Sequence, residues 1–470
     1  MPDPATAPYP TAAATDEFER EPVPENRLKG LKSFIGLYAG EHVAGTEFMI
    51  GPLFLAAGVS AFDLLVGLLI GNLLAVLSWT LVCAPIATRV RLTLYRKLEL
   101  ICGSQLVTIY NLANGLLFCF LAGAMISVSA TALGVGFDMT MPALDDRFPN
   151  SVGWVAAVLV MGGLFAFIAA RGYDSMVGVA NLCVPWMVLA FLACGLVCLP
   201  QLGIHSPADF WPVATQKIWQ GGAPFPGQAK FTFWHVVFFA WTCNAATHIG
   251  MADMSFFRYA KKWPYGASSA AGMFVGHYLA WIAASLLYAV QLAHDPANQK
   301  VAPGPMAWQA AGFAGILCVI AAGWTTANPT IYRAGLALQA VWPRSSRFAV
   351  TLAAGALATG AAIFPALAMK LLDFVGLYGT ILMPMGAIIF VDFWIFPRCG
   401  LQPDLAARTG LRFNLAAGAA WLLTLLACGL LNYYAGVQIY FLAIPGWLLA
   451  GLFYLALSWT LQKRLASPAE

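Results

Sequence analysis

Apolar runs of about 20 residues recur along most of this 470-residue chain, and they restrict its fold more than any other feature. An apolar helix of about 20 residues crosses the hydrocarbon core of a bilayer, which is about 30 Å thick. Loops or open sheet edges in lipid would leave backbone polar groups without partners, so we expect the runs to be helices. Hydrophobic residues make up 60% of the chain and charged residues 10%, a balance that a water-soluble protein would expose as large apolar patches. The sequence therefore predicts an all-α membrane protein.

Hydropathy predicts about 12 transmembrane helices. They are expected at residues 33–58, 64–86, 104–134, 152–170, 175–200, 231–255, 266–293, 306–342, 348–369, 372–396, 413–433 and 437–460. Most of the 25 Lys and Arg residues fall in one set of alternate connections. The exceptions are Arg147, Lys217, Lys230, Lys300 and Lys370, with Arg333 inside the eighth run. Because cytoplasmic loops carry the excess of Lys and Arg, both termini are predicted to be cytoplasmic, in a multi-pass protein of the bacterial cytoplasmic (inner) membrane.

Charge and cysteine patterns argue against several other classes of protein. The net charge of +4 comes from basic residues spread over many short loops, which does not indicate a nucleic-acid partner. The ten cysteines lie in or beside apolar runs without the spacing of metal ligands, so we interpret them as packing residues. We expect no cofactor and no nucleic acid. The lipid bilayer is the expected surrounding, and the chain is expected to be a monomer or a weak homo-oligomer.

Two of the expected spans carry residues that an ordinary membrane helix avoids at mid-depth. The first contains Gly40, Glu41 and His42, and the sixth contains Asn244 and His248. Ionisable residues at the membrane centre cost about 2.5–3.5 kcal/mol each on insertion scales and normally face a cavity or a partner. Interrupted helices five spans apart indicate an inverted repeat, in which the half-helix ends bind substrate and ion. The alternative is that these small and polar residues serve tight helix packing.

The expected repeats divide the chain into five parts. Residues 1–32 are predicted to be a disordered cytoplasmic tail, because they are rich in Pro, Ala and acidic residues. The first five-helix repeat is expected at 33–200, an extracellular or periplasmic loop at 201–230, and the second, inverted repeat at 231–396. Two additional helices and the cytoplasmic C-terminus are expected at 397–470.

Three segments resemble the nucleobase:cation symporter family, which includes cytosine/purine permeases and the uracil, hydantoin and allantoin transporters. Residues 254–262 are similar to that family's Pro-Asp-Phe-Ser-Arg-Phe-Ala-Lys segment. Residues 324–338 are similar to the cytosine-permease stretch ending in Tyr-Ser-Ala-Gly-Leu, and residues 383–394 to the pattern Pro-x-x-Gly-x-x-x-x-Asp-Tyr. The chain resembles a divergent member. This implies a LeuT-type 5+5 inverted repeat with broken helices 1 and 6, and secondary active import of a heterocycle with a cation.

The resemblance also implies a cation site between the first and eighth spans. Thr325 and Thr326 match the family's hydroxyl pair, and the carbonyls of Ala39 and His42 would complete an oxygen shell of the kind that hard cations prefer. Na+ would then be the coupling ion. Alternatively, the Thr hydroxyls bond back to carbonyls of their own helix. A further alternative is proton coupling through Glu41 and His42, because His changes its charge near neutral pH.

A planar heterocycle needs stacking faces and in-plane hydrogen-bond partners. Trp241 and Phe118 are the candidate stacking faces, and Asn111, Asn114 and Asn244 are the candidates that would read the edge of the ring. Residues at the two breaks complete the expected substrate site: Gly40, Glu41, His42 and His248. The family's Trp in span 3 has no clear counterpart here, and its acidic residue in span 6 is displaced to Asp253, so the identity of the substrate stays open.

Three other functions remain open from the sequence. A symporter of the same fold for an amino acid or an amine is the nearest, because the break around Gly40 could hold a carboxylate. A membrane enzyme could use Glu41, His42 and His248, but the chain lacks a metal-binding motif such as His-Glu-x-x-His, and we expect no enzymatic activity. A channel or a non-transporting sensor is the third.

Overall fold

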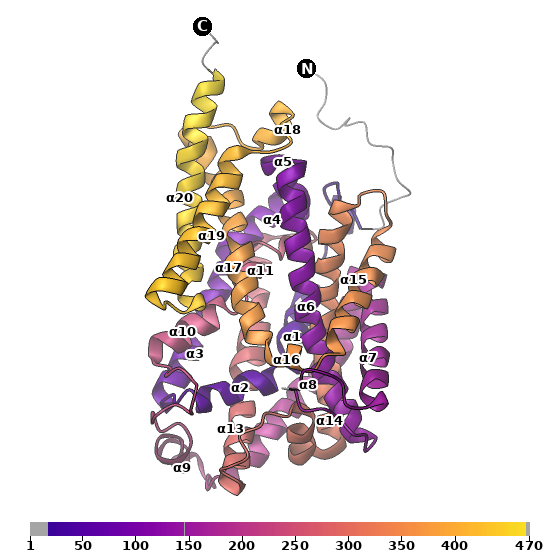
Figure 1. Cartoon of the computed structure of the whole chain (residues 1–470), viewed down its shortest axis with the longest axis vertical. Helices are drawn as coiled ribbons and strands as arrows, with labels where there is room; N and C mark the ends of the chain where they lie inside the picture. Colours follow the sequence, from indigo (N-terminus) through magenta and orange to yellow (C-terminus); the bar gives the residue numbers. More distant parts are fainter. Residues whose placement is uncertain (1–16, 145, 467–470) are drawn as a thin grey trace.

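Helices run along the long axis of the molecule in the computed structural model, which describes residues 17–144 and 146–466 (Figure 1). The described part of the chain begins and ends at the same end of the bundle, which we call the terminal face, and the opposite end is the distal face. Nine helices of the described residues are long and apolar enough to cross a membrane, and three shorter apolar helices lie within the expected first, sixth and ninth spans. The prediction of an all-α membrane protein with about 12 membrane helices is confirmed.

The first repeat begins with a broken helix. α1 (Leu31–His42) ends where the backbone of Val43 leaves helical geometry, at a ψ angle of 64°, and α2 (Glu47–Ala56) begins after residues 43–46. Figure 1 shows α2 lying across the long axis of the bundle. The remaining helices of this repeat are α3 (Ala61–Ser78) with the π-helix η2 (Trp79–Cys83) and α4 (Ala84–Val90), then α5 (Leu94–Cys102), α6 (Ser104–Gly136), α7 (Val152–Arg171) and α8 (Tyr173–Gln201).

The second repeat also begins with a broken helix. α10 (Phe233–Thr242) is followed by two single-turn pieces, α11 (Ala245–His248) and α12 (Met254–Phe257). The approach of α17 to this break depends on Gly386, since a Cβ there would collide with the carbonyl oxygen of Ile249. The repeat continues with η4 (Trp263–Ser268), the π-helix η5 (Ala271–Tyr278), α13 (Leu279–His294), α14 (Pro303–Val341), α15 (Arg347–Ala362), α16 (Ala366–Met369), α17 (Leu371–Phe390), η6 (Val391–Ile395) and η7 (Phe396–Cys399).

Spans 3 and 8 form the centre of the bundle, because α6 and α14 pack against each other more extensively than any other pair of described elements. α19 (Leu415–Ala435) and α20 (Ile439–Ala466) pack on each other, and α20 also packs on α17. Short helices lie in the connections: α9 (Pro207–Val213) with η3 (Ala214–Ile218), and α18 (Leu405–Thr409).

The expectation of a disordered tail over residues 1–32 is wrong for residues 17–32, which pack on the terminal face; residues 1–16 lie outside the described residues. The side chain of Val23 is buried, and its amide donates to the Arg91 carbonyl at 3.1 Å. The Lys29 amide donates to the Tyr259 carbonyl at 2.6 Å, just after the short 3-10 helix η1 (Glu25–Arg27). A few apolar anchors and backbone hydrogen bonds fix this segment, although its composition could not build a core of its own.

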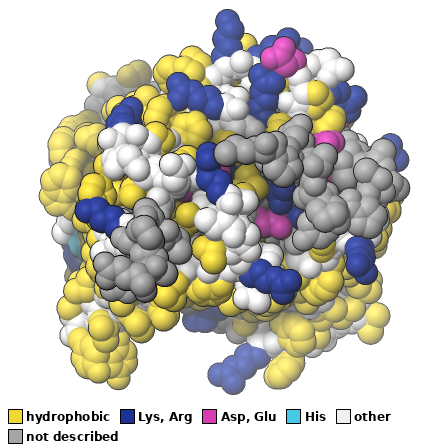
Figure 2. All heavy atoms as spheres, turned by 90° about the horizontal axis from the view of Figure 1, so that it is seen from above, with side chains coloured by type: hydrophobic (Ala, Val, Ile, Leu, Met, Phe, Trp, Pro, Cys, Tyr) yellow, Lys and Arg dark blue, Asp and Glu magenta, His cyan; other side chains and the backbone are white. Residues whose placement is uncertain are grey.

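Figure 2 shows the terminal face, where Lys and Arg side chains are spread over the surface among few Asp and Glu side chains. This is the charge distribution that membrane proteins show on the cytoplasmic side of the bilayer.

Candidate functional site

A small cavity of about 50 Å³ lies where the two broken helices face each other. Its walls come from the α1–α2 break, α6, the α10–α11 break, η5, α14 and α17. The polar part of the lining is formed by Glu41, His42, Thr46, Glu47, Asn244, Thr247, His277, Thr326, Thr330, Arg333 and Tyr378. The apolar part includes Phe118 and Met125. Ionisable groups at this depth therefore face a cavity and one another rather than lipid.

The cavity brings together part of the site expected from the sequence. Glu41, His42, Phe118 and Asn244 line it, as does Thr326 of the expected cation site. The side-chain nitrogen of Asn244 is buried and has no hydrogen-bond partner among the described residues, so it is a donor available to a ligand. Phe118 meets the ring of Tyr378 edge to face, with ring centroids 5.6 Å apart.

Trp241 and His248, both expected at the sixth-span break, do not line this cavity. Trp241 turns to the second span instead, where its indole nitrogen donates to the Ser78 hydroxyl at 3.0 Å. The Nε2 atom of His248 lies 3.0 Å from the carbonyl oxygen of Trp241, and its ring packs against Trp79 at 4.7 Å between centroids. The rotation of the short pieces around the break decides these directions, and the sequence does not specify it.

The amides of Asn111 and Asn114 lie outside the cavity as well. They precede Phe118 on α6 by about 10 Å and about 6 Å along the helix axis, toward the terminal face. Both side chains are buried, and neither has a hydrogen-bond partner among the described residues. Gly40, Ala39 and Thr325 of the predicted sites lie behind the cavity wall, with Gly40 packed against α8 and against Thr325.

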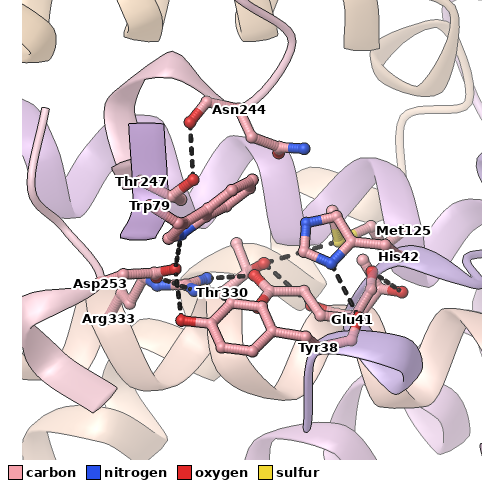
Figure 3. A network of polar contacts seen from close by, with 11 residues as sticks. Tyr38, Glu41, His42, Trp79, Met125, Asn244, Thr247, Asp253, Thr330 and Arg333 are labelled. Atoms are coloured by element: carbon pink, nitrogen blue, oxygen red, sulfur yellow. Dashed lines mark hydrogen bonds and ion pairs between the residues drawn. The ribbon is translucent and has the colours of Figure 1, made fainter. Parts of the chain in front are cut away.

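Arg333 is the central residue of a buried polar network, and the sequence did not assign it a role. Its guanidinium makes two contacts with the Glu41 carboxylate, one of them at 3.0 Å, and donates to Asp253 at 2.5 Å (Figure 3). Asp253 also accepts from the Tyr38 hydroxyl at 2.8 Å and from the Trp79 indole at 2.5 Å. The network joins the end of α1, the start of η2, the start of α12 and the last third of α14.

This network can hold the helices that it joins together only if breaking it costs substantial free energy. Removing one partner from a buried ion pair costs about 3–5 kcal/mol, because the remaining charge is left uncompensated. Two carboxylates, Glu41 and Asp253, share the single guanidinium of Arg333, so the network carries an excess of negative charge when all three groups are ionised. That excess favours a cation nearby.

Two sets of contacts close the terminal side of the bundle. The Arg333 network is the first, and the contacts of the segment 17–29 are the second. The Glu17 carboxylate accepts from the Tyr332 hydroxyl at 2.6 Å, and the Arg258 guanidinium donates to the Phe18 carbonyl at 2.7 Å. Glu19 lies 3.5 Å from the Arg347 guanidinium. Burial raises the pKa of Glu19 above its ordinary value, and its backbone hydrogen bond and the nearby Arg side chains offset this only in part.

Thr326 connects the eighth span to the first-span break. Its hydroxyl lies 2.9 Å from the carbonyl oxygen of Glu41 and 2.8 Å from the carbonyl oxygen of Ala322, one turn earlier on α14. The Thr325 hydroxyl bonds to the Ala321 carbonyl of its own helix at 3.1 Å. Hydroxyl and carbonyl oxygens thus meet beside Thr326, and this donor set suits a hard cation.

Glu47 and His277 form a second buried acid–base pair on the cavity wall. Glu47 begins α2, is 2% exposed, and accepts a hydrogen bond from the Trp281 indole. Its other carboxylate oxygen lies 3.8 Å from Nε2 of His277. The positive N-terminal end of α2 favours an ionised Glu47 by up to about 2 kcal/mol. Burial of a lone carboxylate costs several kcal/mol, so the helix end alone does not balance the charge.

No protein-family model matches the chain, and no curated protein matches it in sequence. Among the described residues, no group of three or more His, Cys, Asp or Glu side chains could hold a metal ion. Glu41, His42 and His248 therefore do not form such a group.

Solved structures do match. Mhp1, a nucleobase-cation-symport-1 family transporter in a closed conformation with bromovinylhydantoin bound, is similar with a TM-score of 0.66 and 16% identity, over 98% of each chain. A Na+-coupled sialic acid symporter in a substrate-bound outward-open state matches with a TM-score of 0.65 and 13% identity, over 98% of this chain and 94% of that chain. MhsT in complex with L-phenylalanine matches with a TM-score of 0.55 and 14% identity, over 90% of this chain and 98% of that one.

These matches confirm the expected LeuT-type fold, with a 5+5 inverted repeat and broken helices 1 and 6. They also confirm the structural resemblance to a nucleobase-cation-symport-1 family transporter. At such low sequence identity they show the fold, and the activity has to be argued from the cavity.

Proposed function

We propose that this multi-pass membrane protein, which shares its fold with cation-coupled symporters, is a secondary active transporter. It imports a nucleobase or related heterocycle of the cytosine, purine, uracil, hydantoin or allantoin class together with Na+ or H+. The observation that carries this proposal is the cavity at the meeting point of both helix breaks, lined by an unpartnered amide, by aromatic rings and by a charged network. Transporters of this architecture bind substrate and ion at such breaks.

The chemistry of the cavity supports a planar, neutral ring as substrate. Phe118 and Tyr378 offer aromatic surfaces, and Asn244 and Thr247 offer in-plane hydrogen-bonding groups. A carboxylate substrate would need a free cation, but the guanidinium of Arg333 is already engaged by two carboxylates. The excess negative charge of that network favours a cation. Within the second candidate, an amine or amino-acid symporter of the same fold, this supports the amine.

Alternating access follows from the two closures of the terminal side. The distal side is more open, with a hollow of about 820 Å³ lined in part by Met49, Pro52 and Leu53 of α2. Opening toward the terminal face requires that the contacts of Arg333 and of the segment 17–29 break. Coupling then requires that ion and substrate together bind the two states with different affinities. The Lys and Arg on the terminal face support its placement on the cytoplasmic side of a bacterial inner membrane.

Thermal stabilisation of the purified protein tests the substrate. The panel comprises purines, pyrimidines, hydantoins, allantoin, amino acids and amines, each with sodium, with potassium and at two pH values. We expect a heterocycle to raise the melting temperature in a cation-dependent way. Stabilisation by amino acids or amines alone would overturn the heterocycle proposal.

Asn244→Ala and Trp241→Phe form a matched pair for the same assay. Loss of the Asn244 amide should remove one hydrogen bond to the ring, about 0.5–1.5 kcal/mol, and weaken affinity by about two- to tenfold. The side chain of Trp241 lies outside the cavity, so Trp241→Phe should leave the affinity for the heterocycle unchanged. Equal effects of the two variants would place the substrate elsewhere.

A further inference from the structure

The pair Glu47 and His277 has no counterion of fixed charge. Within the described part of the chain, the ion-pair partner of Glu47 is His277, and no Lys or Arg contacts its carboxylate. The other groups that face the pair are the thiol of Cys243, just after the end of α10, and His42 on α1, whose ring centroid lies 5.0 Å from that of His277. Across the cavity, the guanidinium of Arg333 is shared by the carboxylates of Glu41 and Asp253.

Charge balance therefore depends on a proton. An ionised Glu47 beside a neutral His277 leaves one uncompensated negative charge at the membrane centre, where such a charge is strongly disfavoured. One proton on Glu47, or one on His277, makes the pair neutral overall. Glu41 differs from Glu47 because a fixed cation contacts it: the guanidinium of Arg333, which it shares with Asp253.

The fold holds the pair between the two aqueous sides. α2 carries Glu47 at its start, and its later residues Met49 and Leu53 line the distal hollow. On the other element, η5 is a π-helix, a rare geometry that is frequently found at functional sites. Gly276 in η5 lets this helix pack directly on the α1 break, since a Cβ there would collide with the backbone of His42.

We propose that Glu47 and His277 are the proton-binding site of this transporter, so that one proton is carried with each substrate molecule. The cotransport of the proton with substrate rests on the proposed function, whereas the existence of the proton site does not. The proton enters from the distal side and binds at the carboxylate of Glu47, whose Oε1 atom lies 3.8 Å from Nε2 of His277. It leaves with the substrate at the terminal side, and one positive charge crosses the membrane for each neutral substrate.

Binding of substrate and binding of the proton should each strengthen the other, because the substrate displaces water from the cavity. A ring in the cavity displaces the water that would otherwise stabilise an ionised Glu47, so a bound substrate requires the protonated pair. By reciprocity, the protonated pair binds substrate more tightly than the ionised pair. Substrate affinity should fall by about tenfold per pH unit once the pair begins to lose its proton.

Infrared spectroscopy of the purified protein tests the proton site without any substrate. We expect a protonated-carboxyl band in the difference spectrum between about pH 5.5 and about pH 8.5. Glu47→Gln should remove the contribution of Glu47 to this band, and Asp63→Asn, the same change at an acid at the start of α3, should leave the band unchanged. His277→Gln should shift the pH at which the band disappears, and it serves as the second variant if Glu47→Gln does not fold. A band that is unchanged in both Glu47→Gln and His277→Gln overturns the proton site.

Transport by reconstituted vesicles tests the coupling, with the heterocycle identified by thermal stabilisation. Glu47→Gln should abolish accumulation driven by a proton gradient and keep the exchange of labelled for unlabelled substrate. Proton-driven accumulation that persists in Glu47→Gln overturns the coupling. If no heterocycle binds at all, the proposed function fails, and the infrared result still decides on the proton site.

Discussion

Replacement of Arg333 by Gln should destabilise the protein strongly, because the change leaves two buried carboxylates without their shared cation. Arg333 is 1% exposed and contacts both Glu41 and Asp253. Loss of one partner from a buried pair costs about 3–5 kcal/mol, so we expect a destabilisation of at least that size. The matched control is Arg171→Gln on the exposed surface, which should change stability by less than about 0.5 kcal/mol.

A double-mutant cycle separates the pairing from general damage. Glu41→Gln alone leaves Arg333 with Asp253, and the double variant Glu41→Gln/Arg333→Gln removes both members of the pair. The double variant should lose less stability than the sum of the two single variants, by about 0.5–3 kcal/mol.

Equilibrium unfolding in mixed detergent micelles measures these free energies. Thermal unfolding followed by a thiol-reactive dye gives an independent ranking, since the cysteines are free and most are buried. If the effects of Glu41→Gln and Arg333→Gln add to within about 0.3–0.5 kcal/mol, the two groups are not coupled and the reasoning about the network is refuted.

Further predictions concern the cation site and the N-terminal segment. If sodium raises the melting temperature, Thr326→Ala should abolish the rise, because the Thr326 hydroxyl reaches the α1 break. Thr325→Ala should keep the rise, because the Thr325 hydroxyl bonds to its own helix. A rise that is lost in Thr325→Ala and kept in Thr326→Ala would contradict the assignment. Because the docked state raises the pKa of Glu19, it binds protons more tightly than the free segment does, so docking of residues 17–29 should weaken as pH rises from about 4.5 through the raised pKa. Hydrogen exchange of the segment amides, corrected for intrinsic rates, should show this loss of protection, and Glu19→Gln should remove its pH dependence; protection that is independent of pH in the unmodified protein would contradict it.

The sequence predicted the membrane helices, the two breaks and the repeat, because apolar length and buried polar residues leave few alternatives in lipid. It also placed Glu41, His42 and Asn244 at the breaks, where the structure has them on the cavity wall. It did not predict the direction of Trp241, which depends on how a single helical turn is rotated against its neighbours.

Arg333 and His277 were missed for a different reason. Arg333 was noticed inside the eighth run but was given no partner. A charge inside the membrane normally pairs with an opposite charge. Glu41 in the first span and Asp253 in the sixth span were the acids available to pair with it. That pairing could have been inferred. His277 lies in an otherwise apolar run, and only the packing of η5 on α1 brings it to Glu47.

Uptake by proteoliposomes tests the central claim most directly. Purified protein is reconstituted, and labelled heterocycles are supplied outside with an inward gradient of protons, of sodium or of neither. The account predicts that one class of heterocycle accumulates above its external concentration only with a cation gradient, and that uptake saturates. Uptake that equilibrates without saturation, or accumulation of an amino acid or an amine but of no heterocycle, would contradict it.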